Sequence, residues 1–143
     1  MITIHENQLK DAIAVSRQIL EFDPPYEIDE YQKRLTTEHL ILTAIDHHSP
    51  VGFKIGYDRF GDGSFYSWMG GVLPEFRRKG IAGQLAHYQE DWAREKGFTS
   101  ICLKTRRKHL KMITFLLKRG FVISEEIKKI PIEETRVWMI KEL

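Results

Sequence analysis

The hydrophobic positions along this chain follow two periods, and the changes between them predict the order of the elements. Strands are predicted by alternating or continuous apolar runs over residues 2–6, 40–45, 51–60, 65–73, 98–104, 121–127 and 135–140. Helices are predicted by helical spacing and capping residues over 8–20, 29–35, 81–97 and 108–119. The order is therefore β-α-α-β-β-β-α-β-α-β-β, a mixed α/β domain of class α+β.

The connections between these elements add two expectations. Gly61-Asp62-Gly63 is a hairpin signal, so the second to fourth strands form a meander. Gly70-Gly71, inside a strand, predicts a bulge or a close backbone approach. The strand-helix-strand unit over residues 65–104 predicts a parallel strand pair with a right-handed crossover. No linker or repeat divides the chain, which predicts one domain over residues 1–143.

The composition says more about the cellular setting of the protein than about the reaction it could catalyse. The 143 residues carry a net charge of only +2, so anion binding must come from local clusters of charge. The lone Cys102 excludes an intramolecular disulfide and a Cys-only zinc site. Neither a signal peptide at MITIHENQLK nor a membrane-spanning apolar run is seen. We expect a cytoplasmic protein that does not bind membranes.

The tightest cluster of positive charge is RRKGIA, residues 77–82, which joins a predicted strand to a predicted helix. The start of a helix presents backbone N–H groups without partners and the positive end of a dipole. Gly80 and Ala82 keep the approach to those groups open, and Arg77, Arg78 and Lys79 add full charges. Although such a run alone is typical of a solvated turn, this context favours an anion site.

A second basic cluster, Arg106-Arg107-Lys108, follows the neighbouring strand. Ligands of open α/β sheets bind outside the carboxyl ends of strands, so both clusters are predicted at the same edge. The Walker pattern and GxGxxG are absent, which argues against nucleoside triphosphates and ordinary dinucleotides. A small nucleic-acid binder is also disfavoured, because no aromatic residues are interleaved with the basic ones.

These residues resemble the acetyl-CoA motif of the GNAT N-acetyltransferase superfamily, (Q/R)-x-x-G-x-(G/A), at Arg77, Gly80 and Ala82. The lead-in VLPEF and the segment KRGF near the C-terminal end extend the resemblance over essentially the whole chain. It implies a fold in which the strand before the motif splays from its parallel neighbour. The pantetheine arm of acetyl-CoA lies in that splay, and no metal takes part.

The resemblance also implies which residues hold acetyl-CoA. Backbone around Val72 and Leu73 would bind the pantetheine arm, and a backbone N–H near Val72 would polarise the thioester. The pyrophosphate would be held by Arg77, Arg78, Lys79, Gly80, Ile81, Ala82 and Gly83. Arg107 or Lys108 would reach the 3′-phosphate or a pantetheine carbonyl.

The acid and base of the family do not transfer to this sequence. Many relatives carry a glutamate on the strand before the motif, but residues 65–73 contain no acid. Many also have a tyrosine four residues before the final Gly-Phe, where this chain has Leu116. His109 and Tyr66 are the substitutes we single out, each weighed against a purely structural role. Tyr88 and Cys102 are more simply read as packing residues.

In the resembling family, the segment after the first strand walls the acceptor site. It points to Phe22, Asp23 and Tyr26, with Trp68 facing the same cleft. The acidic side chains of residues 21–30 suit a cationic amine, although solvated helix ends explain them equally well.

The resulting prediction is an acetyl-CoA-dependent N-acetyltransferase acting on a primary amine of a small molecule or peptide. The alternative is a catalytically weak acyl-CoA-binding regulatory module, because the usual acid and base are missing. The predicted partners are acetyl-CoA and an amine, not nucleic acid. A homodimer is the assembly that the resemblance suggests.

Overall fold

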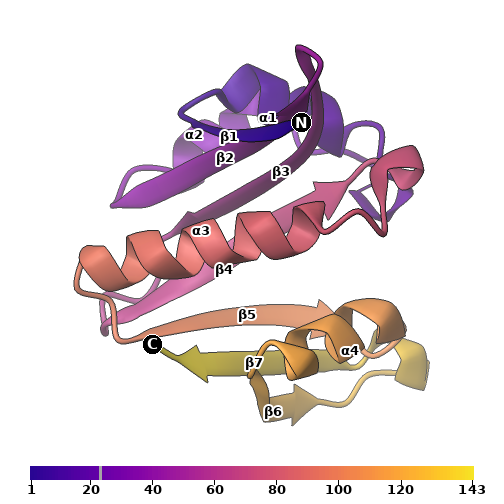
Figure 1. Cartoon of the computed structure of the whole chain (residues 1–143). Coiled ribbons are helices and arrows are strands. Elements are labelled where there is room, and N and C mark those ends of the chain that lie inside the picture. The colour runs from indigo at the N-terminus through magenta and orange to yellow at the C-terminus, as the bar shows by residue number, and fades with distance from the viewer. Residues whose placement is uncertain (23) are drawn as a thin grey trace.

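A computed structural model of the chain, which describes residues 1–22 and 24–143, contains one mixed sheet flanked by helices (Figure 1). The strands are β1 (Ile2–Glu6), β2 (His39–Asp46), β3 (Ser49–Tyr57), β4 (Ser64–Val72), β5 (Ser100–Arg106), β6 (Val122–Ile127) and β7 (Arg136–Glu142). The helices are α1 (Leu9–Ser16), α2 (Ile28–Arg34), α3 (Ile81–Glu95) and α4 (Leu110–Lys118), with short 3-10 turns η1 (Leu20–Phe22), η2 (Pro74–Phe76) and η3 (Ile132–Glu134). The seven-stranded sheet has the order β1-β2-β3-β4-β5-β7-β6.

The pairing of β4 with β5 is parallel, as the sequence predicted, but it is short. Only Ser64–Tyr66 pair with Ser100–Cys102. Beyond that point β4 stays paired with β3 up to Val72, and β5 stays paired with β7 up to Arg106. The two strands therefore diverge toward their carboxyl ends (Figure 1). Residues 67–72 of β4 and 103–106 of β5 do not pair with each other, and we call this region the β4/β5 splay.

The two faces of the sheet carry separate cores. On one face α3 and α4 cover a cluster that includes Leu42, Phe65, Leu85 and Met139. On the other face α1 and α2 cover a cluster that includes Ile13, Tyr31 and Phe53. Figure 1 shows α3 crossing the sheet in front, with α1 and α2 behind β1–β3. On the face opposite α3, α1 packs against β4, while none of the helices in the described residues covers β5 and β7.

Two local features differ from the sequence prediction, and one expected close approach is confirmed. The first helix ends at Ser16 instead of residue 20, and η1 follows it, because the Oγ of Ser16 donates to the Ile13 carbonyl at 2.8 Å. The bulge lies opposite Ile55–Gly56, at Trp68, and not at Gly70-Gly71. The close approach is nevertheless at Gly71, where a Cβ would lie 2.6 Å from Ile19 Cδ1.

A buried carboxylate ties α3 to α4 and β7. The side chain of Glu90 is 7% exposed and accepts from Arg119 at 3.0 Å and Lys141 at 2.8 Å. Burial alone would raise the pKa of Glu90, but the bonds from Lys141 and Arg119 hold it below the ordinary value. The longest helix, α3, has 15 residues, and none of the helices that the structure describes is long and apolar enough to cross a membrane.

Replacing Glu90 with glutamine is expected to cost about 3 kcal/mol of folding free energy at pH 7, because two cations lose their buried partner. The lowered pKa means that this contribution is present above pH ~4.5 and is lost as the pH falls through the folded-state pKa. Denaturant unfolding at pH 7 and at acidic pH checks both points. Glu95→Gln, exposed on the same helix, is the control. Equal midpoints for the two variants would contradict the prediction.

Candidate functional site

The start of α3 offers free backbone donors at the carboxyl edge of the sheet. The first helical hydrogen bond runs from Gln84 N–H to the Gly80 carbonyl at 3.0 Å. Within residues 1–22 and 24–143, no acceptor is recorded for the N–H groups of Ile81, Ala82 and Gly83. Gly80 has φ +79°, and a Cβ there would meet no atom within 4 Å. Position 80 therefore borders open space next to these donors, and its left-handed backbone explains why it is glycine.

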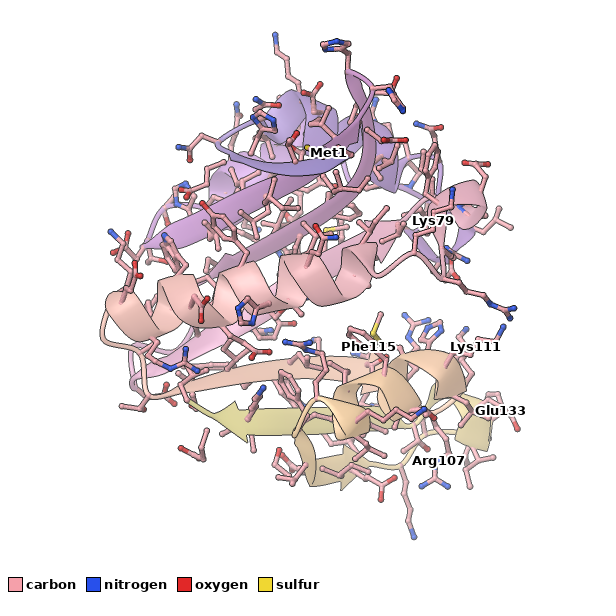
Figure 2. All side chains as sticks on the ribbon, in the orientation of Figure 1. Met1, Lys79, Arg107, Lys111, Phe115 and Glu133 are labelled. Atoms are coloured by element: carbon pink, nitrogen blue, oxygen red, sulfur yellow. The ribbon has the colours of Figure 1, made fainter. Side chains whose placement is uncertain are left out.

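The basic side chains before α3 have different roles. Arg77 folds back and its Nε donates to the Val72 carbonyl at 2.9 Å, so it also braces the end of β4. Arg78 and Lys79 are exposed, and neither forms an ion pair with any residue in the described part of the chain. Lys79 lies over the Phe76 ring, 5.2 Å from its centroid, on the turn visible in Figure 2. These two charges remain available for an anion.

The second basic cluster is largely neutralised by the protein. Arg107 pairs with Glu126, and Lys108 pairs with Glu134 at 2.8 Å. Arg106 also approaches Glu134, at 3.3 Å. In Figure 2 Arg107 lies below α4, on the side of β6 and β7. Cofactor contacts from Arg107 and Lys108 would thus require these ion pairs to open.

The β4/β5 splay exposes backbone groups of β4. Leu73 N–H donates to Val51 O at 2.9 Å and the Leu73 carbonyl accepts from Phe76 N–H at 2.9 Å, so both groups of Leu73 are used within the protein. In an antiparallel pair, successive residues point their backbone groups to opposite sides. Gly70 and Val72 therefore direct theirs away from β3, into the splay, where the Val72 carbonyl already accepts from Arg77 Nε. Contacts of backbone around Val72 and Leu73 with a cofactor stay a prediction, and at Leu73 both backbone groups already have partners.

Lys54 is a residue at the splay that the sequence reasoning missed. It pairs with Gly70 across β3 and β4, and a Cβ on Gly70 would lie 3.4 Å from both its Cγ and its Nζ. Burial and, to a smaller extent, the Arg119 guanidinium lower the pKa of Lys54 to about 8, with Glu90 partly opposing both. The available signal was one cation inside the apolar strand VGFKIGY.

His109 lies at the N-cap of α4, half-buried at the same carboxyl edge. Desolvation lowers its pKa, and the cations of Lys108 and Arg106 lower it further. Glu21, in η1, is close enough to favour the charged form, which places η1 and His109 near each other. The imidazole is therefore neutral at pH 7 and able to accept a proton.

Tyr66 is only 1% exposed and lies among other aromatic rings on the face opposite α3. Burial raises its pKa, so its hydroxyl keeps its proton at neutral pH. This property suits a proton donor and not a base. Leu116, at the position of the family's tyrosine, is buried in the core under α3 and α4.

The predicted acceptor residues lie beside β4 on the α1 side. A Cβ on Gly71 would lie 3.5 Å from Phe22, and the Tyr26 ring lies 5.5 Å from the Trp68 ring, centroid to centroid. Asp23 lies outside the described residues. Cys102 is buried and burial raises its pKa, which fits a packing role. No group of His, Cys, Asp and Glu side chains in the described part of the chain is arranged to hold a metal.

A model of the acetyltransferase (GNAT) family matches residues 7–121. No curated protein matches the chain significantly.

Solved structures of several acetyltransferases are similar to this fold. The ribosomal-protein-S18-alanine N-acetyltransferase from Escherichia coli has a TM-score of 0.85 at 16% identity, covering 99% of this chain and 94% of the other. Ard1 from Thermoplasma volcanium has a TM-score of 0.82 at 22% identity, covering 99% and 97%. The PaiA N-acetyltransferase from Thermoplasma acidophilum, in complex with coenzyme A, has a TM-score of 0.76 at 17% identity, covering 100% and 99%.

Proposed function

Because the chain belongs to the acetyltransferase (GNAT) family, we propose that the β4/β5 splay and the start of α3 form its acetyl-CoA site. The family assignment makes the protein an acetyl-CoA-dependent N-acetyltransferase, which transfers an acetyl group to an amine. A purely regulatory acyl-CoA-binding role is not favoured. The observation that carries the site is the coincidence of free helix N–H groups with the divergence of β4 from β5.

The residues present fit a pyrophosphate at the start of α3. The N–H groups of Ile81, Ala82 and Gly83 supply donors, and the missing side chain of Gly80 leaves the space for the anion. Arg78 and Lys79 add charge that no described carboxylate neutralises. Arg77 contributes mainly by holding the end of β4 in place.

The pantetheine arm fits along the splay, where the backbone groups of Gly70 and Val72 face outward. An amide arm can form the ladder contacts that β5 no longer supplies to β4. A Val72 N–H aimed at the thioester oxygen would stabilise the charge that develops there. Lys108 and Arg107 are secondary contacts in this proposal, because their ion pairs must open first.

In the reaction, an N–C bond forms as the C–S bond breaks, one proton leaves the amine and one reaches the sulfur. An alkyl amine with a pKa near 10.4 must first lose a proton, at a cost of about 4.6 kcal/mol at pH 7. Holding the two reactants in attack geometry contributes about 7–11 kcal/mol. The gain from positioning therefore exceeds the cost of deprotonating the amine, and proton transfer needs only modest help from the protein.

We assign the proton-transfer roles by protonation state and place. His109 is neutral at pH 7 and is the candidate base for the amine. Lys54 is the candidate donor to the leaving sulfur, because its ammonium lies against Gly70 with a pKa of about 8, near that of a thiol. Tyr66 remains a second candidate donor. The acceptor would bind against Phe22, Tyr26 and Trp68, with Asp23 also predicted there.

Acetylation of a panel of amines tests the function. Incubation with acetyl-CoA and a panel of amino acids, peptides, polyamines and aminoglycosides is expected to release free CoA thiol with at least one class. Mass spectrometry of the product should show one added acetyl group. Tight CoA binding with no turnover on any amine would instead support the binding module.

The remaining expectations concern the setting of the enzyme. Residues 1–143 act as one domain in this proposal, because β1 and β6 are edges of the same sheet. The buried free thiol of Cys102 is consistent with a reducing cytoplasm. A homodimer is supported by exposed apolar side chains of α4 and β6, including Leu117, Val122 and Ile123.

A further inference from the structure

The face of the sheet opposite α3 carries a continuous aromatic surface. Ring centroids lie 5.5 Å apart for Tyr26 and Trp68, 5.9 Å for Trp68 and Tyr57, 5.6 Å for Tyr57 and Tyr66, and 6.0 Å for Tyr66 and Trp138. The surface thus runs from the segment before α2, across β3 and β4, to β7. Trp68 and Trp138 are only partly buried, so these rings do more than fill the core on this face.

Cationic side chains lie directly on these rings. Arg34 lies 4.6 Å from the Trp68 ring and Arg59 lies 4.8 Å from the Tyr66 ring. Lys104 lies 5.7 Å from the Trp138 ring. The surface is therefore both aromatic and positively charged.

The positive charge is not balanced by the protein. Arg34 pairs with Glu30 at 3.0 Å, but Arg59, Lys104 and Arg136 have no carboxylate within ion-pair distance in residues 1–22 and 24–143. Desolvation lowers the pKa of Lys104, and the guanidinium groups of Arg59, Arg136, Arg34 and Arg106 lower it further. Cations that converge in this way without a partner leave a place for an anion.

The place of this surface matters as much as its charge. Cys102 is the last residue of β5 that pairs with β4, and Lys104 follows it on the same face, at the mouth of the splay. Trp68 is the bulged residue of β4 at the same level. An acceptor that reaches the splay from the face opposite α3 must therefore lie across these side chains.

We propose that the acceptor is a primary amine that also carries a carboxylate and a planar apolar group, as an aromatic amino acid does. The planar group packs against the exposed parts of Trp68 and Trp138, and the carboxylate binds Arg59 and Lys104. This inference rests on the proposed function, since it names the substrate class of that site. A polycationic acceptor is less favoured, because two of the acids in the α1–α2 segment already pair with arginines, Glu27 with Arg17 and Glu30 with Arg34.

Matched acceptors isolate the carboxylate. We expect kcat/KM for L-phenylalanine to exceed that for phenethylamine and L-phenylalaninamide by at least about tenfold, as removal of a charge-assisted contact requires. L-tryptophan and tryptamine form a second pair. Arg59→Gln and Lys104→Gln should each reduce this ratio severalfold. The control is Lys96→Gln, which removes a cation 5.7 Å from the Trp92 ring, on α3, and should leave the ratio unchanged.

A binding measurement separates this inference from the function on which it rests. N-acetyl-L-phenylalanine and N-acetylphenethylamine are titrated calorimetrically onto the full chain in the presence of CoA. Tighter binding of the carboxylate, weakened in Arg59→Gln and Lys104→Gln, supports the inference even if no turnover is detected. Equal binding, or efficient acetylation of the decarboxylated amines, overturns it and leaves the acetyltransferase assignment intact. Failure to bind CoA at all would overturn the proposed cofactor site itself.

Discussion

Gly80→Glu is expected to abolish CoA binding while the domain remains folded. The carboxylate would enter the open space above the N–H groups of Ile81, Ala82 and Gly83 and take the place of the pyrophosphate. It would also repel the remaining phosphate oxygens. We expect the Kd for CoA to rise at least about 100-fold, the loss of two or more charge-assisted hydrogen bonds. Isothermal titration with CoA measures it.

The matched control for this substitution lies at the other end of the same helix. Gly97 has φ +93°, and a Cβ there also meets nothing within 4 Å. Gly97→Glu therefore pays the same left-handed backbone cost, about 1–2 kcal/mol, without approaching the free donors. Both variants should show similar, modest decreases in melting temperature, and only Gly80→Glu should lose CoA. Normal CoA affinity in folded Gly80→Glu protein would overturn the assignment of the pyrophosphate site.

The fold was largely predictable from the sequence, because the hydrophobic period and the turn residues are local signals. The parallel pair of β4 and β5 followed from the strand-helix-strand order, and the family shown by the comparisons is the one that the motif at Gly80 suggested. The observed end of a helix differed from the predicted one where a side chain competed for a backbone hydrogen bond, as Ser16 does at the end of α1. The bulge moved from Gly70 to Trp68, because glycine marks flexibility and not the register.

The candidate site was predictable from the sequence only where its proposed contacts are made by backbone groups. Gly80 and the start of α3 were recognisable, since the requirement for free N–H groups appears directly in the sequence. Which basic side chains form ion pairs was not predictable, because ion pairing depends on contacts between residues that are distant in the sequence. Arg107 and Lys108 are neutralised by Glu126 and Glu134, whereas Arg59 and Lys104, which no motif marks, are left without partners in the described residues. Lys54 was missed for the same reason, since its neighbour Gly70 comes from another strand.

Lys54→Met is expected to lower turnover and to raise stability at the same time. Loss of the proton donor to the leaving sulfur should reduce kcat about 100-fold, with little change in the Kd for CoA. Lys54→Arg should not restore turnover, because a guanidinium does not release its proton near pH 8. In the wild type, kcat should fall above pH ~8 as the Lys54 ammonium deprotonates. Pre-steady-state kinetics across this range would isolate the chemical step.

The stability effect has a definite sign. The folded-state pKa of Lys54, about 8, lies below the ordinary 10.5, so the folded protein binds this proton more weakly than the unfolded chain does. The buried ammonium therefore costs about 2–3 kcal/mol below pH 8, and the cost is relieved as the pH rises from about 8 to about 10.5. Lys54→Met should accordingly melt higher than the wild type at pH 7, and the difference should shrink in that window.

The two outcomes together distinguish a functional lysine from a structural one. A buried lysine without a catalytic role would, when replaced by methionine, still change the pH dependence of stability but would leave the pH dependence of kcat unchanged. Lys33→Met, an exposed lysine on α2, controls for the loss of one positive charge and should alter neither. If Lys54→Met keeps full turnover with an unchanged alkaline limb, the proton reaches the sulfur from another group, and Tyr66 becomes the donor to test. Conserved turnover with raised stability would leave the buried cation as a cost without a catalytic return.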